Sequence, residues 1–247
     1  MYHRTSSPNL RLLLSGTALT VRLNLKTDPS LYSGGVGKLK AFMTPIELES
    51  GILGRYAYGK IEYPYTSGAL GPSPDVTTKS NPFPPGRFHQ DPFSGNSNLS
   101  SFYVQTLVPL FNSQKSFYFH LDNTTINDDA LLAADANLLQ LLSHRAHIGK
   151  IVAESKYAAD VTTYTTLIKA RNSTGIKTLL TNTTQEAAVL AQADAAAKVF
   201  SAAWVGSGAS VATTFTSDLQ NATAKLFRAL IDITTEIEVQ YLMARFN

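Results

Sequence analysis

Most of this chain carries apolar residues at intervals of three and four positions, the spacing that places them on one face of an amphipathic helix. The most regular pattern covers residues 130–158, and a second long one covers 215–246. The pattern predicts helices over 9–26, 36–58, 98–111, 130–158, 160–170, 183–203 and 215–246, with a turn or short helix over 175–180.

Segments rich in proline, glycine and serine separate these helices. Residues 64–97 contain seven prolines, which forbid a continuous helix and favour a long extended loop. The small residues of 205–212 predict a flexible hinge, and only 56–65 and 116–121 resemble strands. The chain is therefore predicted to be all-α: residues 1–247 form a single-domain helical bundle with a long Pro-rich loop.

Composition narrows the classes of function. With 247 residues, of which 44% are hydrophobic and 16% charged, the chain can bury a core. Its net charge of +3 is too small and too evenly spread to predict a nucleic-acid partner, and no apolar stretch is long enough for a membrane span. Cysteine is absent, which excludes disulfides and thiolate metal sites. His144 and His147 lack a third ligand nearby, so they are expected to pack and hydrogen-bond rather than hold a metal.

The polar residues on the apolar face of segment 139–156 are the main candidates for chemistry. Arg145 and Lys156 are eleven residues apart. On one continuous helix that spacing brings the second side chain back to within about 20° of the first. Two cations on a face that is otherwise Leu, Ile, Val and Ala favour a site for a small dianion. The alternative is that they pair with Asp135 or Glu154 on the same helix.

Two further pairs have helical spacing. Asn182 and Glu186 are four residues apart, and so are Thr234 and Glu238. Together with the two cations they could line a ligand site in the core of a bundle. Other interpretations stay open: Glu186 also completes a capping-box pattern with Thr183, Thr234 could bond back to a carbonyl, and Glu238 could face solvent.

Three motifs in this chain resemble eukaryotic, yeast- and plant-type chorismate mutases. Residues 139–157 resemble the family pattern L-Q-x-L-S-x-R-x-H-x-G-K-x-x-A-E-x-K-F, and 233–246 are similar to L-T-K-E-V-E-V-x-Y-L-x-R-R-L. Residues 180–186 look like L-T-N-x-x-V-E, with weaker similarity over 54–64 and 98–110. The resemblance covers the chain from about residue 37 to its end, and its first two motifs are long and ungapped.

The resemblance implies an isomerase that converts chorismate to prephenate without a cofactor, and a homodimer. It implies that Arg145 holds a substrate carboxylate and that Lys156 binds a carboxylate and the ether oxygen. Asn182 and Thr234 would each contact a carboxylate. Glu186 would accept from the ring hydroxyl, and a protonated Glu238 would donate to the ether oxygen. A carboxyl group that donates needs a raised pKa, so activity is expected to fall as pH rises.

The chain departs from the family pattern in its first helix. Gly16 stands where the family has an arginine, and Arg22 is a substitute if the helix is shifted. The family's effector-binding pairs correspond to Gly54-Arg55 and Asp129-Ala130, so we expect no control by tyrosine or tryptophan.

Several features of the chain bear on its location. Its first residues lack the apolar stretch of a signal peptide. The chain carries N-x-S/T sequons at Asn98, Asn123, Asn172, Asn182 and Asn221. Together with the expected loss of control, they resemble the unregulated chorismate mutases that plant-pathogenic fungi secrete as effectors. We therefore expect a mature secreted protein, with a cytoplasmic enzyme as the alternative. A rival class of function is a weak or inactive helical binding protein that docks a host protein through the 64–97 loop.

Overall fold

The computed structural model describes residues 45, 86, 88–89, 93–113, 128–205 and 209–246. The predicted helices over 9–26 and 36–58 lie outside these residues, apart from Pro45, and so do both strand candidates and most of the 64–97 loop.

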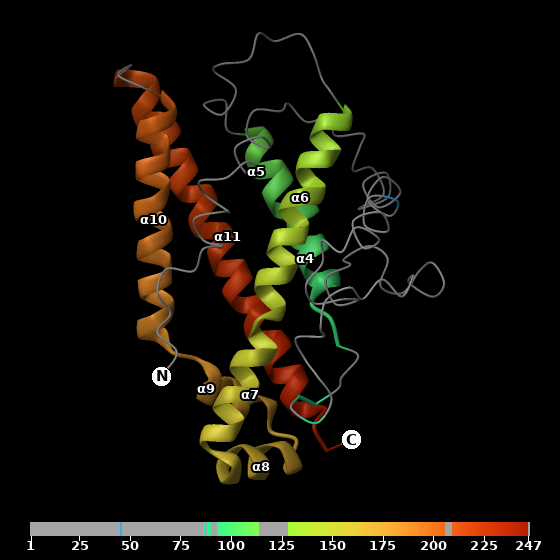
Figure 1. Ribbon diagram of the computed structural model, residues 1–247. Coiled ribbons are helices and arrows are strands. Elements are labelled where there is room, and N and C mark those ends of the chain that lie inside the picture. The colour runs from blue at the N-terminus through green and yellow to red at the C-terminus, as the bar shows by residue number, and fades with distance from the viewer. Residues whose placement is uncertain are drawn as a thin grey trace. The chain divides into compact units, whose positions relative to one another are not determined.

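The described part of the chain is helical, with no strand beyond an isolated bridge at Phe88 (Figure 1). The prediction of an all-α fold is confirmed. Its elements are α4 (Asn96–Phe102), the π-helical turn η3 (Tyr103–Leu107), α5 (Val108–Ser113), α6 (Asp128–His147), α7 (Gly149–Ala159), α8 (Val161–Lys169), α9 (Ser173–Leu180), α10 (Thr183–Val205) and α11 (Ala209–Met243).

The chain forms two compact units. The first contains residues 1–43, 100–141 and 185–229, and the second contains 44–99, 142–184 and 230–247. The boundary falls within α4, α6, α10 and α11, so four continuous helices contribute to both units. The single-domain organisation of 1–247 stays a prediction.

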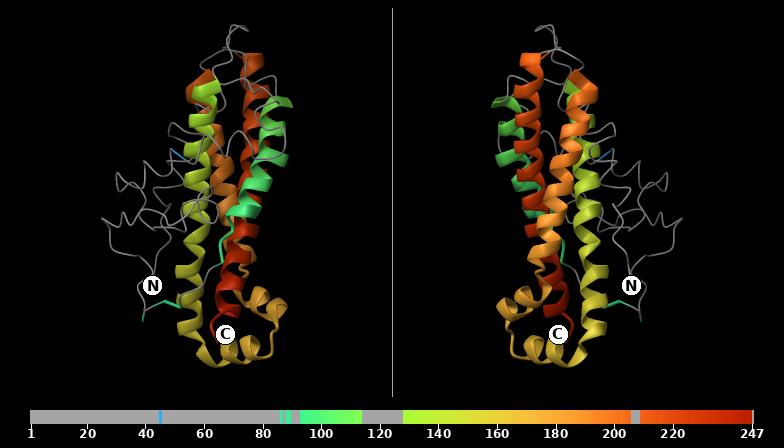
Figure 2. Two further views of the ribbon diagram at one scale, coloured as in Figure 1. Left: turned by 90° about the vertical axis from the view of Figure 1, so that its right-hand side faces the viewer. Right: turned by 90° about the vertical axis from the view of Figure 1, so that its left-hand side faces the viewer.

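In the first unit, α10 and α11 lie side by side and run in opposite directions (Figures 1 and 2). The Ser201 and Thr216 hydroxyls are 2.7 Å apart, and Gln220 donates to the Asp194 carboxylate, so polar contacts join these two helices along their length. Buried apolar residues of this unit include Leu138, Phe215 and Leu226.

In the second unit, three short helices pack beside the C-terminal part of α11 (Figure 2). The Asp160 carboxylate caps α8 by accepting from the Thr163 N–H at 3.1 Å, and Asn172 caps α9 by accepting from the Gly175 N–H at 2.8 Å. The apolar core of this unit comprises Ala153, Tyr157, Tyr164, Ile168, Ile176, Leu180, Val239, Tyr241 and Leu242.

Helix limits differ from the predictions most clearly in three places. The helix predicted over 130–158 is two helices with a turn at Ile148, where the Ile151 N–H bonds to the Ile148 carbonyl at 3.0 Å in a tighter, three-residue step. Ile148 keeps right-handed helical angles, with φ −56° and ψ −22°, so the interruption is local. Residues 209–212 were predicted as part of a hinge and are instead helical, since Ala and Ser are tolerated in both settings. Residues 175–180 belong to a complete eight-residue helix, α9.

Candidate functional site

Five of the six predicted site residues belong to the second unit. Arg145 lies in the last turn of α6, Lys156 in the last turn of α7, and Asn182 between α9 and α10, whereas Thr234 and Glu238 are one turn apart on α11. The sixth, Glu186, lies on α10 within the first unit.

Gly149 brings α7 and α11 unusually close. A Cβ atom at this position would be 2.9 Å from Thr234 Cγ2, 3.1 Å from the Thr234 carbonyl oxygen and 3.1 Å from Glu238 Cγ. Only a residue without a side chain allows this contact, because carbon atoms in ordinary contact are farther apart. The first residue of α7 therefore packs directly on the α11 turn that carries both predicted site residues.

Glu238 is buried, with 5% of its surface exposed, so the alternative in which it faces solvent is wrong. Its neighbourhood includes Tyr164 of α8. Burial raises the pKa of the Tyr164 phenol, and the Glu238 and Asp160 charges raise it further.

Thr234 makes the hydrogen bond to a backbone carbonyl that was one of the alternatives in the sequence analysis. Its hydroxyl donates to the Leu230 carbonyl at 2.6 Å, a bond back along the same helix. The hydroxyl has a single proton, so Thr234 donates to a substrate carboxylate only if the hydroxyl turns away from the Leu230 carbonyl.

The Lys156 ammonium donates to the Leu180 carbonyl at the C-terminal end of α9. A helix C-terminus carries partial negative charge, which favours a cation there. This bond holds the ammonium close to the turn that contains Asn182, whose side chain is exposed. An ammonium has three donors, so one bond to a carbonyl is compatible with binding an anion.

Arg145 is half-buried at the end of α6, between two histidines. Burial lowers the pKa of His144, so that ring is neutral at neutral pH. His147 is 1% exposed and accepts from the Gly95 N–H at 3.3 Å through Nε2, while its Nδ1 bonds to the Ser143 carbonyl at 2.8 Å. His147 therefore packs and hydrogen-bonds as predicted. Within the described ranges, no three His, Asp or Glu residues are grouped as a metal site would require.

Glu186 pairs with the Arg228 guanidinium of α11 at 3.0 Å, inside the first unit. The carboxylate side chain is 21% exposed and its partner 47%. α10 begins at Thr183, which makes Thr183 a helical residue rather than the cap that a capping box requires.

The two acids that were alternative partners for the cations are engaged elsewhere. Glu154 binds Arg245 through both oxygens, at 2.5 and 2.9 Å, and also accepts from the Tyr241 hydroxyl at 2.7 Å. Asp135 is fully buried and accepts from the Tyr103 hydroxyl. The Glu154 cluster was not predicted, although Glu154, Tyr241 and Arg245 all lie in the two long motifs.

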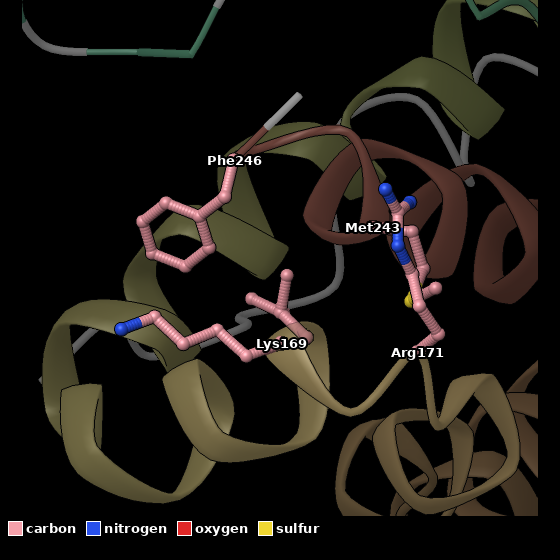
Figure 3. A pocket seen from close by; sticks show the side chains of 5 residues that line it. Lys169, Arg171, Met243 and Phe246 are labelled. Atoms are coloured by element: carbon pink, nitrogen blue, oxygen red, sulfur yellow. The ribbon is translucent and has the colours of Figure 1, made fainter.

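A small pocket of about 200 Å³ lies near the C-terminal end of α11, lined by Ile168, Lys169, Arg171, Met243 and Phe246 (Figure 3). None of the six predicted site residues lines it. No described helix is long and apolar enough to cross a membrane.

Comparison with known proteins identifies the family. No protein-family model matches the chain. The chorismate mutase of Schizosaccharomyces pombe is 32% identical over 194 residues, which is 77% of this chain and 70% of that protein. The chorismate mutase of Saccharomyces cerevisiae is 29% identical over 157 residues, 62% of this chain and 56% of that protein.

A solved structure agrees with the sequence comparison. The crystal structure of a Candida albicans chorismate mutase in complex with L-Trp matches the fold with a TM-score of 0.63, over 96% of this chain and 87% of that chain, at 23% identity. The chain therefore belongs to the chorismate mutase family of isomerases, and chorismate is the substrate that this membership implies.

Proposed function

We propose that this chain rearranges chorismate to prephenate with the α6, α7 and α11 residues of the second unit as its working parts. Arg145 and Lys156 bind the substrate carboxylates, and Glu238 donates a hydrogen bond to the ether oxygen. The observation that carries the proposal is the contact at Gly149. It packs the turn bearing Thr234 and Glu238 onto α7, whose last turn carries Lys156.

The reaction suits these residue types. It is an intramolecular rearrangement in which the ether C–O bond breaks as a new C–C bond forms, with no covalent enzyme intermediate. The protein must hold a flexible dianion in its reactive conformation and stabilise negative charge that grows on the ether oxygen. Positioning can lower the barrier by about 7 kcal/mol, and a preorganised donor can contribute about 3 kcal/mol more.

Asn182 and Glu186 have subsidiary roles in this proposal. Asn182 supports a substrate carboxylate, and Glu186 accepts a hydrogen bond from the ring hydroxyl. The pairing of Glu186 with Arg228 supports an accepting role, because a carboxylate beside a guanidinium is an acceptor only. The residue that replaces the family's first-helix arginine, Gly16 or Arg22 in this chain, lies outside the described residues.

We propose that tyrosine and tryptophan do not control this enzyme, although a Candida albicans chorismate mutase has been solved in complex with L-Trp. The proposal rests on Gly54-Arg55 and Asp129-Ala130, which depart from the family's effector-binding pairs. Adding either amino acid should leave turnover unchanged, and inhibition or activation at millimolar concentration would contradict it.

Secretion and dimerisation are further proposals. Four of the five sequons lie within the described residues, and the asparagines at 98, 172 and 221 are exposed, as a glycan would require. Asn182 is exposed too, but a glycan there would block its proposed contact with the substrate. Exposure supports secretion, which a shift in mass after treatment of secreted protein with a glycosidase would test.

A homodimer predicts twice the chain mass in analytical ultracentrifugation. A host protein that docks on the 64–97 loop should bind intact chain and not a variant with that loop shortened.

The function itself is tested by following the loss of chorismate absorbance with purified wild type and with Arg145→Ala. Wild type should turn over chorismate, and the variant should lose the activity while keeping its helical circular dichroism. Absence of turnover in a well-folded wild type would refute the proposal and favour the binding-protein alternative.

A further inference from the structure

Glu154 is the centre of a polar cluster that joins α7 to the end of α11. Its two oxygens bind the Arg245 guanidinium at 2.5 and 2.9 Å, and one of them also accepts from the Tyr241 hydroxyl at 2.7 Å. The side chains of Glu154 and Arg245 are only 16% and 21% exposed, and Tyr241 is 1% exposed. Two parallel donors on one carboxylate fix both its position and its orientation.

The cluster extends to the segment before α4. The His89 N–H donates to the Tyr241 hydroxyl oxygen at 2.9 Å, so this oxygen both donates and accepts. The Arg245 guanidinium carbon lies 3.8 Å from the centre of the Tyr157 ring, which holds the guanidinium plane from a second side. Three segments of the second unit are therefore fixed to one carboxylate.

The charges in this cluster are mutually dependent. Burial alone would raise the pKa of Glu154, but the hydrogen bonds from Arg245 and Tyr241 and the Arg245 charge outweigh it and hold that pKa below its ordinary value. Burial, together with the bond to Glu154, raises the pKa of the Tyr241 phenol. The cluster therefore stays as carboxylate, guanidinium and neutral phenol across the neutral pH range.

The cluster borders the proposed catalytic residues on both helices. Glu154 precedes Lys156 by two positions, which places it on roughly the opposite side of α7, and Tyr241 follows Glu238 by three positions on α11. Gly149, five positions before Glu154 on α7, lies against the Thr234 and Glu238 side chains of α11. The turn that carries Glu238 is thus held between a steric contact and a charged, bidentate one.

We propose that Glu154 is a positioning residue for the rearrangement: through Tyr241 and Arg245 it fixes the α11 turn of Glu238 relative to the helix of Lys156. The inference rests on the proposed role of Glu238. Glu154 does not touch the substrate, and its effect on the reaction passes through the placement of the Glu238 carboxyl group.

The test uses Glu154→Gln, which keeps the shape of the side chain but turns one acceptor oxygen into a donor facing the guanidinium. Because Arg145 and Lys156 still bind the substrate, KM should change less than about twofold. Misplacement of the donor should lower kcat by about tenfold or more, since errors of 1 Å can cost about a hundredfold. Tyr241→Phe, which removes only the hydroxyl, should lower kcat in the same direction and serves if the first variant does not fold.

A double variant separates positioning from general structural damage. If Glu154 acts through Glu238, then Glu154→Gln combined with Glu238→Ala, which removes the donor, should be no slower than Glu238→Ala alone, within about twofold. Effects on kcat that multiply in the double variant would overturn the proposal while leaving the role of Glu238 intact. An unchanged kcat in Glu238→Ala itself would overturn both.

A matched control guards against an effect of stability. Asn172→Ala removes the exposed cap of α9, which lies in the same unit but contacts neither the cluster nor Glu238 through that bond. It should lower the melting temperature and leave kcat unchanged at a temperature well below melting. If the control loses as much kcat as Glu154→Gln at equal loss of melting temperature, Glu154 is merely structural and the proposal fails.

Discussion

Replacing Gly149 by alanine is the most direct test of the α7–α11 contact. The added methyl group would lie 2.9 Å from Thr234 Cγ2 and 3.1 Å from Glu238 Cγ, whereas ordinary contacts begin at 3.4 Å. The shortfall is about 0.5 Å for the closer pair and about 0.3 Å for the other. The Thr234 carbonyl oxygen is also 3.1 Å away, so rotation of side chains alone cannot remove the clash.

The expected changes in stability and in kcat show which of the two Gly149→Ala should affect more. Overpacking a tight contact costs about 1–3 kcal/mol, and alanine in place of a helical glycine returns about 1 kcal/mol, so we expect a net loss of stability of about 0–2 kcal/mol. The movement of Glu238 is of the size that matters for positioning: a shift of about 0.5 Å should lower kcat by about tenfold. The loss of activity should therefore exceed what the change in stability explains.

Gly175 provides the matched control. A Cβ there would be 2.9 Å from Leu167 Cδ2 and 2.9 Å from Asn172 Nδ2, a comparable clash at the start of α9. Chorismate turnover and chemical denaturation are measured for both alanine variants. Gly149→Ala should lose kcat and Gly175→Ala should not, at similar cost in stability. Equal kcat in wild type and Gly149→Ala would refute the idea that this contact places Glu238.

Three further predictions use other residues of the second unit. Activity should fall with rising pH as Glu238 ionises, and Glu238→Gln should show a flatter pH profile of kcat; a flat wild-type profile would argue against donation by Glu238. The lowered pKa of Glu154 means that its stabilising effect is complete above the ordinary glutamate pKa and is lost as pH falls through the lowered value. The melting temperature of wild type should therefore fall more steeply below about pH 4 than that of Glu154→Gln. Ser143 donates to the buried Asn96 oxygen at 2.6 Å, so Ser143→Ala should cost about 1–2 kcal/mol in urea denaturation, and an unchanged midpoint would contradict this.

The spacing of apolar residues predicted the helical class and most helix positions, because burial of one face every three or four residues dominates helix formation. The first and last residues of the helices were harder to predict. The turn at Ile148 precedes a glycine whose close contact is with a helix about 85 residues later in the chain, and no local pattern records that contact. The start of α11 at Ala209 was missed because small residues suit both a hinge and a helix that packs against a neighbour.

In the candidate site, too, features set within one helix were predicted and contacts between helices were not. Spacing along single helices correctly put Thr234 one turn from Glu238, and it offered the back-bond of Thr234 as an alternative that the structure shows. Spacing along one helix could not predict which basic residue pairs with an acidic residue, because these partners lie on other helices. Glu186, for which a capping box was one interpretation beside a substrate contact, pairs with Arg228. Glu154, which was an alternative partner for Arg145 or Lys156, binds Arg245.

The long motif that carries the family resemblance holds two kinds of residue. Arg145 and Lys156 are there for the substrate in our proposal, but their neighbours in the motif bind the protein itself. His147 accepts from the Gly95 N–H, the buried Lys150 donates to the Phe93 carbonyl at 2.9 Å, and Glu154 holds Arg245.

These contacts reach in two directions, toward the segment before α4 and toward the end of α11. A dianion site made of fixed cations and one buried carboxyl group depends on preorganised geometry, because the chemistry requires no covalent step by the protein. Because α6 and α7 supply the cations and also anchor the neighbouring segments, several positions of the motif between the site residues are under a physical constraint. Binding the substrate alone would require only a few isolated residues. The additional contacts within the protein explain why the resemblance is long and ungapped.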